Sequence, residues 1–498
     1  MYIGYDKKKG HEYAKLYTSV RNGKRTSKDY LNLGRVLDKE RGIYRNRERG
    51  VFSYQLETNS YGKAPEDFVP PVKKNKNESL IVDFGDMYFL DTFIRDNCLV
   101  EPISSIGYVN RDTLNAMIAY YVLCPMANCH AHDWWEGSYA RILYPDANLT
   151  SQRISDFLST IGDESPIRAF FREYIKIVGL SGDTCNILID SSGLPDSIHF
   201  PLSAIRSNDG DISDEVRLIY VVRQETGLPI YFRYCPGNVI DASTLVRCLA
   251  ELKESGVNAK LAILDADAGY YSDHNIGELY ESKVPFVTRL KSNRALYKEL
   301  VKEHLGTLCV ESNLVEYNGR NVFLKYAPCE LAGHKAYAYI CLDIMRENDE
   351  SRKTFENAKD KKLDSSQVFK AMRKRGVFIL VSSLRIARKN LLPLYYTRQQ
   401  VEQVFDLGKP HADLLPLHVQ NEDSLRGHLF LTFIATVIYK KLQDALIKTH
   451  INPISLFFTL RNQKCNIYND KVITQGAVKN ADDCYRIFNY ECPVSIPR

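Results

Sequence analysis

The sequence lacks any apolar run long enough to cross a bilayer. Its longest such run, 429–439, is well short of the roughly 20 apolar residues that a membrane-spanning helix needs. We therefore predict a buried helix here and expect no membrane partner. We also recognise no signal peptide, which favours a cytoplasmic location.

The twelve cysteines lack the regular spacing of a disulfide framework. Reduced thiols in a cytoplasmic protein are the simplest interpretation. Four metal-ligating side chains do lie close together in the sequence and raise the alternative of a zinc site: Cys124, Cys129, His130 and His132. Their spacing fits no standard zinc finger, so ordinary packing and surface roles are favoured.

Charge of one sign is not in large excess, since the net charge is only +5 over 498 residues. Residues 1–50 nevertheless carry 14 Lys and Arg against 6 Asp and Glu, and 373–389 is again basic. Basic patches on a nearly neutral protein are typical of nucleic-acid binding on selected surfaces. With 44% hydrophobic and 26% charged residues, the chain is otherwise ordinary and long enough for about three domains.

The N-terminal part of the chain divides into two predicted units. Residues 1–68 are expected to form a small basic β-rich unit, in which Asn22-Gly23 is typical of a tight hairpin turn. A linker is expected at 70–76, and 80–180 is predicted to be a mostly helical, DNA-binding domain. One helix beginning near Ser151 carries apolar residues at helical spacing: Ile154, Phe157, Leu158 and Ile161. Such a helix suits DNA reading, although one helix of a bundle is the commoner outcome.

From about residue 183 the pattern changes to strands and helices in the order β-β-β-α-β-α-β. The expected strands are 186–189, 217–223, 230–235, 261–264 and 285–290. Strands joined by turns predict an antiparallel meander, and strands joined through helices predict parallel additions. This order is that of an α/β fold with a ribonuclease-H-like catalytic core, which we assign to 183–296 and 376–448. Residues 297–375 are predicted to be a β-rich insertion, and 449–498 a C-terminal tail.

Two aspartates stand at predicted strand ends, Asp190 after the first strand and Asp267 after the fourth. Carboxylates at strand ends converge at the carboxyl edge of an open α/β sheet, and Glu402 on a later helix is predicted to supply a third. Asp265 competes with Asp267, because strand alternation points both to the same side. Asp267 is preferred because it directly precedes a turn, 268–270. Singly, each aspartate is more commonly a turn or cap residue.

Three carboxylates without nitrogen or thiolate partners suit the hard cations Mg²⁺ or Mn²⁺. Two such ions, roughly 4 Å apart, can activate an attacking hydroxyl and stabilise the leaving oxygen of a phosphodiester. We therefore expect a two-ion site held by Asp190, Asp267 and Glu402.

Glu402 belongs to a spaced set, Y-x2-R-x3-E-x6-K: Tyr395, Arg398, Glu402 and Lys409. If all four residues lie on one helix, their side chains project at about 0°, 300°, 340° and 320° around the helix axis, within one arc. A carboxylate among basic groups suits a metal ion beside a nucleic-acid backbone, whereas the alternative is an exposed face with an Arg/Glu pair. Thr397 and Gln400 have the spacing of a capping box. Such a cap would place Tyr395 just outside the helix. The shared arc would then be established only for Arg398 and Glu402.

These residues resemble the DDE transposases of bacterial and archaeal insertion sequences, in the group with the Tyr/Arg/Glu/Lys signature. Four stretches carry the resemblance: LIDSSG at 188–193, PGN at 236–238, DADAGYYS at 265–272 and YYTRQQVEQVFDLGK at 395–409. The last matches the family spacing in full, and the resemblance covers about 185–445. It implies a ribonuclease-H-like fold with Asp190, Asp267 and Glu402 as metal ligands.

The resemblance also implies that Tyr395, Arg398 and Lys409 contact DNA near the cleaved strand. We add Arg289 and Lys291, which follow the fifth predicted strand, as further phosphate contacts. Their alternative role is surface solubility.

The function implied by the resemblance is that of a nucleoid-associated transposase acting on double-stranded DNA. It would bind the terminal inverted repeats of its element, cleave the ends, and join the 3′-hydroxyls to target DNA, as a homodimer that pairs two ends. No serine, tyrosine or cysteine nucleophile is required. Two alternatives remain: a metal-dependent nuclease without joining, and a catalytically inactive DNA-binding descendant, whose mark would be a lost carboxylate.

Overall fold

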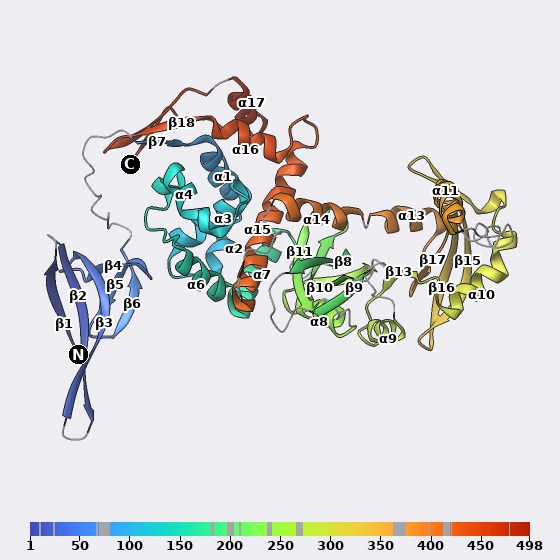
Figure 1. The fold of residues 1–498 in the computed structure, drawn as a ribbon, viewed down its shortest axis with the longest axis horizontal. Helices are drawn as coiled ribbons and strands as arrows, with labels where there is room; N and C mark the ends of the chain where they lie inside the picture. Colours follow the sequence, from blue (N-terminus) through green and yellow to red (C-terminus); the bar gives the residue numbers. More distant parts are fainter. Residues whose placement is uncertain are drawn as a thin grey trace. The chain divides into compact units, whose positions relative to one another are not determined.

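The computed structural model describes residues 1–498 apart from 9–10, 23–24, 66–67, 69–79, 181–183, 197–203, 209–210, 237–241, 265–271, 362–374, 398, 412–418, 420 and 478. The chain forms two compact units (Figure 1). The first comprises 1–173, 410–414 and 418–498, and the second comprises 174–409 and 415–417. The predicted linker at 70–76 lies outside the described residues.

The first unit begins with six antiparallel strands that pair in chain order: β1 (Tyr2–Lys8), β2 (His11–Asn22), β3 (Arg25–Asp38), β4 (Ile43–Asn46), β5 (Gly50–Gln55) and β6 (Ser60–Lys63). One face of this sheet closes over a small core: Ala14, Leu16, Leu33, Tyr44, Phe52 and Tyr54. Asn22 pairs with Arg25 across the β2–β3 hairpin, which confirms the predicted hairpin.

A helical bundle follows, as predicted: α1 (Gly85–Asp96), α2 (Val100–Ser105), α3 (Arg111–Leu123), α4 (Ala131–Gly137), α5 (Ala140–Leu143), α6 (Ser151–Ile161) and α7 (Glu164–Ile177). The four apolar residues expected on one face of α6 are all buried. They belong to the bundle, because α6 packs against α15 (Glu422–Leu446).

The helix α15 contains the apolar run 429–439 and is buried along it, as predicted. A Cβ at Gly427 would overlap the backbone of Leu158, so glycine permits the close approach of α15 to α6. The sequence grouped this helix with the catalytic core, whereas the structure places it in the first unit. Among the described residues, no helix is both long enough and apolar enough to cross a membrane.

The predicted tail at 449–498 is folded into the first unit. It contains α16 (Pro453–Arg461), β18 (Lys464–Ile467), β19 (Lys471–Thr474), α17 (Lys479–Ile487) and β20 (Ser495–Pro497). These strands form a sheet in the order β20-β19-β18-β7. The strand β7 (Leu80–Asp83) lies far earlier in the chain than the other three.

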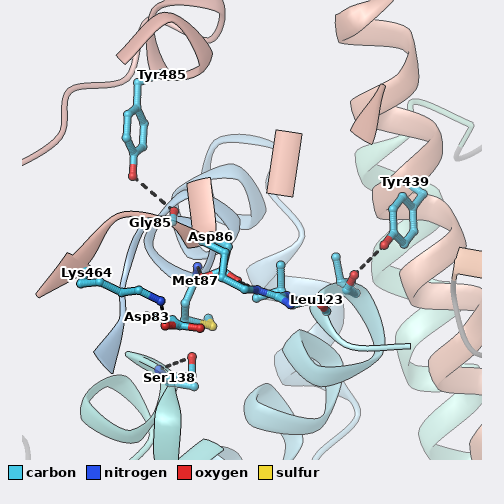
Figure 2. Close-up of polar contacts among 12 residues, drawn as sticks. Asp83, Gly85, Asp86, Met87, Leu123, Ser138, Tyr439, Lys464 and Tyr485 are labelled. Carbon is cyan, nitrogen blue, oxygen red and sulfur yellow. Dashed lines mark hydrogen bonds and ion pairs between the residues drawn. The ribbon is translucent and has the colours of Figure 1, made fainter. Parts of the chain in front are cut away.

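Polar contacts reinforce this long-range pairing (Figure 2). Arg461 Nε donates to the buried carboxylate of Asp86 at 2.6 Å, and its guanidinium also donates to the carbonyl of Leu123. Lys464 pairs with Asp83, and the hydroxyl of Tyr485 donates to the carbonyl of Gly85 at 3.2 Å. The segment after α15 is therefore part of the helical unit.

The second unit is built on one large mixed sheet. Its first part contains β8 (Thr184–Asp196), β9 (Ala204–Asn208), β10 (Asp211–Arg223), β11 (Pro229–Pro236), β12 (Asn258–Leu264) and β13 (Phe286–Leu290), with α8 (Ala242–Glu254) and α9 (Asp273–Glu281) between the later strands. The order is β11-β10-β8-β12-β13, with β8, β10 and β11 antiparallel and β12 and β13 added parallel to β8. The predicted meander and parallel additions are confirmed, while β9 was not foreseen.

The strands of the predicted insertion extend the same sheet beyond β13, through a strand of the second core segment. The insertion strands are β14 (Leu314–Tyr317), β15 (Arg320–Leu331) and β16 (His334–Asp343), and the core strand is β17 (Val377–Ser382), in the order β13-β17-β16-β15-β14. Asn318 and Gly319 both have positive φ, as the turn between β14 and β15 requires. Among the described residues, this part also contains the helices α10 (Ala295–His304) and α11 (Ile344–Lys361), and α13 (Arg388–Tyr396) and α14 (Gln399–His411) follow β17.

Candidate active site

The register of the large sheet places Asp190 on one face together with residues of three other strands. Asp190 is paired directly with Tyr220 of β10, so the two side chains share a face. Leu188 of β8 is paired with Ile263 of β12, which is paired with Val287 of β13. Because residues two apart in a strand point to the same face, Arg289 lies on the same face as Asp190. We call it the site face.

Asp190 lies within β8 rather than at its end, which corrects the prediction from sequence. The strand continues to Asp196 because it keeps pairing with β10. The half-buried Asp190 carboxylate accepts a hydrogen bond from the Ser191 backbone N–H at 2.7 Å. Asp190 therefore directly follows Ile189, which forms the last parallel pair with β12 among the described residues.

The helices α13 and α14 follow one another along the chain (Figure 1). The ring of Tyr395, in the last turn of α13, stacks near Phe378 of β17 with centroids 6.4 Å apart. The ring of Phe405 in α14 lies 4.9 Å from that of Tyr220, the cross-strand partner of Asp190. One helix is thus anchored over β17 and the other over β10, on the two sides of β8 and β12.

Glu402 is exposed in the first turn of α14, three residues before the anchor Phe405. Residues three apart lie on neighbouring parts of a helix surface, and Phe405 contacts the partner of Asp190. Glu402 therefore lies about one helical turn from the contact between α14 and β10, and its own side chain is exposed. A carboxylate in the first turn is also favoured by the helix dipole.

The spacing suggested that the signature lies on a single helix, but the structure divides it between α13 and α14. The hydroxyl of Thr397 donates to the carbonyl of Leu394 at 2.6 Å, so Thr397 ends α13 instead of capping α14. Tyr395 therefore lies inside α13, and it is only 3% exposed. The predicted DNA contact of Tyr395 stays a prediction.

Several predicted site residues lie wholly or partly outside the described structure. Asp265, Asp267 and Arg398 are outside the described residues, and for Lys409 only the backbone, within α14, is described. The described chain does leave β12 at Leu264, directly before this acidic stretch and level with Ile189. Their proposed roles stay predictions.

Arg289 and Lys291 were predicted to contact phosphates. Arg289 is half-buried on the site face, and its guanidinium carbon lies 5.9 Å from the ring centroid of Phe378. Phe378 thus lies near both Arg289 and the ring of Tyr395. Lys291 follows β13 directly and is half-buried. Both residues stand at the end of a strand that borders β12, and their phosphate contact stays a prediction.

A buried carboxylate with polar partners holds α13 against the strands of the insertion. Asp343, at the end of β16, is fully buried and accepts a hydrogen bond from Arg320 at 3.1 Å and one from the hydroxyl of Tyr396 at 3.4 Å. The ring of Tyr396 also stacks on Tyr317 with centroids 5.7 Å apart. We call these four residues the α13 clasp.

The chemistry of the donor set fits Mg²⁺ or Mn²⁺, because Asp190 and Glu402 offer only carboxylate oxygens. Among the residues that the structure describes, no three His, Cys, Asp or Glu gather as a metal site; Asp267 is not among them. Residues 124–132 are among the described residues, and their Cys and His side chains do not form such a group either.

Sequence reasoning missed the residues that anchor the two helices and the α13 clasp. Tyr220 is a tyrosine within an otherwise aliphatic stretch of β10, and Phe405 follows Glu402 by one helical turn. These were the available signals for a contact between β10 and α14. Asp343 also accepts a hydrogen bond from the Arg346 backbone N–H at 3.1 Å, at the start of α11, but no local pattern indicates its partners in β15 and α13.

Residues 208–438 match the family model described as "Transposase DDE domain". This match supports a DDE transposase; it includes Asp267 and Glu402 and begins after Asp190. A comparison with curated protein sequences found no match. Among solved structures, the chain is similar to a cryo-EM structure of a piggyBac transposase synaptic complex with hairpin DNA, with 13% identity, 76% of this chain and 79% of that chain covered, and a TM-score of 0.39.

Proposed function

We propose that this chain is a DNA transposase that cleaves the ends of its own element and joins their 3′-hydroxyls to target DNA. The observation that supports the proposal is the contact on the site face between Phe405, three residues after Glu402, and Tyr220, the cross-strand partner of Asp190. The strand order β11-β10-β8-β12-β13 supports a ribonuclease-H-like core, and the family match supports the DDE class.

The proposed metal ligands are Asp190, Asp267 and Glu402. When bound, two Mg²⁺ or Mn²⁺ ions would activate the attacking hydroxyl and stabilise the leaving oxygen. The carboxylates of Asp190 and Glu402 belong to different elements, so the anchors of α14 fix the position of one relative to the other. Arg289, Lys291, Arg398 and Lys409 are proposed to hold the DNA backbone, and Tyr395 to position α13.

The proposed reaction has two steps. Water first attacks the phosphorus at an element end, and the 3′ oxygen leaves as a hydroxyl. That 3′-hydroxyl then attacks a phosphodiester of target DNA, which replaces one P–O bond by another. Because water and DNA are the nucleophiles, no covalent bond to the protein forms. Pairing of two ends by a homodimer, with terminal inverted repeats as the bound sequence, is part of the proposal.

The test is a cleavage and joining assay with Mn²⁺, the purified full-length protein and the double-stranded DNA that flanks its gene. Asp190→Asn is compared with Asp406→Asn, an exposed acid on the same helix as Glu402. We expect nicking at the element ends and joined products that only Asp190→Asn abolishes. Cleavage without joining would favour the nuclease, and sequence-specific binding without cleavage in any metal would favour an inactive descendant.

A further inference from the structure

The six-stranded sheet at 1–63 holds most of the protein's excess positive charge. Its first fifty residues carry 14 Lys and Arg against 6 Asp and Glu, although the whole chain has a net charge of only +5. The remainder of the chain is therefore slightly negative. A polyanion would be attracted to this sheet more than to the rest of the protein.

The two faces of this sheet differ. Ile3, Ala14 and Leu16 point into the small core, so their neighbours along each strand point outward. Across β1, β2 and β3 the outward residues in register are three tyrosines: Tyr2 is paired with Tyr17, and Tyr17 with Tyr30. We call these three residues the tyrosine row.

The tyrosine row is an ordered but accessible surface. The rings of Tyr2 and Tyr17 stack with centroids 5.2 Å apart, and those of Tyr17 and Tyr30 are 6.1 Å apart. A Cβ at Gly4 would come within 2.7 Å of the Tyr17 ring, so the absence of a side chain there lets the ring lie on the sheet. Tyr30 is 62% exposed and Tyr2 47% exposed, which is unusual for large aromatic side chains.

A lysine accompanies the tyrosine row. The Nζ atom of Lys15, on the same face, lies 4.9 Å from the centre of the Tyr30 ring. It also pairs with the half-exposed Asp6 at 3.5 Å, a contact of the weak, screened kind. The outer face thus offers phenol hydroxyls and an ammonium group, which are donors that proteins use toward phosphate oxygens.

The β2–β3 hairpin extends past the tyrosine row as a two-stranded ribbon (Figure 1). Beyond Tyr17, β2 pairs only with β3, through Asn22 and Arg25. Five residues on each strand give a ribbon about 17 Å long. The stretch 19–28 contains four basic residues and no acidic one. The major groove of B-DNA, about 12 Å wide, admits a two-stranded β-ribbon.

We propose that the N-terminal sheet is a double-stranded DNA-binding surface, with the β2–β3 ribbon entering a groove and the tyrosine row with Lys15 lying against the adjacent sugar-phosphate backbone. This inference rests on the proposed function, because that function makes duplex DNA the substrate. It assigns DNA contact to this sheet in addition to the helical region at 80–180.

The test measures binding of the full-length protein to a fluorescein-labelled 30-base-pair duplex at several salt concentrations. We expect Tyr2→Ala/Tyr30→Ala to weaken binding about tenfold. We expect Lys15→Gln to lower the slope of log affinity against log salt by about one. The matched controls are Tyr468→Ala, at a tyrosine 41% exposed elsewhere in the first unit, and Lys39→Gln, at a lysine 4.0 Å from the ring of Tyr5. Thermal melting verifies that each variant is folded.

The outcomes separate this inference from the proposed function. If the wild-type protein binds the duplex and the row variants bind like the controls, the tyrosine row has no role in binding and the inference is overturned, while the transposase proposal stands. If the row variants lost affinity for single-stranded DNA but not for the duplex, the inference would also be overturned, because the bound DNA would not be a duplex. A wild-type protein that binds no duplex DNA at any salt concentration would overturn both proposals.

Discussion

Glu402 occupies a position where its charge matters more than its packing. The side chain is exposed, and the helix around it is held by Val401, Val404 and Phe405, which are buried. We expect Glu402→Gln to abolish metal-dependent cleavage and joining, because one ligand charge is lost, while DNA binding survives through Lys and Arg contacts to phosphate. Gel-shift and cleavage assays on the same preparation measure both.

The matched control for this variant is Asp406→Asn, which removes an exposed charge one turn further along α14. It should keep full activity. Parallel loss of binding and cleavage in Glu402→Gln would instead assign Glu402 a structural role.

Asp112 gives the helical region a pH-dependent stability. Burial raises the pKa of its carboxyl from 3.8 to about 6, only partly offset by the hydrogen bond from the backbone N–H of Asp146 at 2.8 Å. The folded state keeps the proton up to about pH 6, whereas the unfolded chain releases it near pH 4. The Asp112 contribution is therefore fully present below pH 4 and is lost as pH rises to about 6, by at most about 3 kcal/mol.

Asp112→Asn should remove this dependence, since an amide oxygen still accepts the hydrogen bond but does not titrate. The measurement is the free energy of unfolding in urea between pH 4 and 7 for wild type, Asp112→Asn and Asp133→Asn, an exposed acid on α4. An unchanged pH profile in Asp112→Asn would contradict the assignment.

At the scale of elements, the insertion does more than lengthen the sheet. Its strands carry Asp343, Arg320 and Tyr317, which hold Tyr396 and with it the end of α13. We expect Asp343→Asn to lower the melting temperature and slow cleavage about tenfold, because α14 follows α13 directly and Glu402 would lose its fixed position. Replacing one partner of a buried polar network costs roughly 1–3 kcal/mol.

The readout that identifies positioning is a slower single-turnover cleavage rate with unchanged DNA affinity. Glu316→Gln, at an exposed acid on β14, is the control and should match wild type in both measurements. Weaker DNA binding at an unchanged rate would show that the clasp serves binding instead.

At the scale of the whole molecule, the first unit depends on a segment distant in sequence. The Asp86 carboxylate is 1% exposed, and Arg461 is its charged partner. We expect Arg461→Met to destabilise this unit by about 3–5 kcal/mol, because a buried charge loses its partner. Hydrogen exchange should then accelerate together in α1 and in β18. The double variant Asp86→Asn/Arg461→Met should recover part of the loss, and exchange that accelerates in only one of the two segments would contradict the joint unit.

The sequence predicted those elements whose signals are local. The buried strands β8, β10 and β13 and the apolar face of α6 follow from periodicity, and the turn at Asn318-Gly319 follows from its need for positive φ. The pairing of β18 with β7 and the continuation of β8 past Asp190 depend on partners far along the chain, which no local pattern encodes.

The same distinction holds for the site. The proposed site acids Asp190 and Glu402 were selected from residue type and spacing, but the residues that anchor the elements around them were not foreseen. Tyr220 and Phe405 become meaningful only once α14 is known to lie over β10. The break between α13 and α14 was missed because the hydroxyl of Thr397 bonds backward to Leu394, and spacing alone does not distinguish this from a forward cap.

The contact between Arg461 and Asp86 also sets an order of events during synthesis. The two residues are 375 positions apart, so a ribosome adding about 5–20 residues per second makes α1 roughly 20 to 75 s before its partner appears. During that time the Asp86 carboxylate has no counter-ion, and Glu402 is synthesised before Arg461. A chain interrupted between these points would carry the acids of the site on a protein whose first unit cannot close, and we expect cellular proteases to remove it.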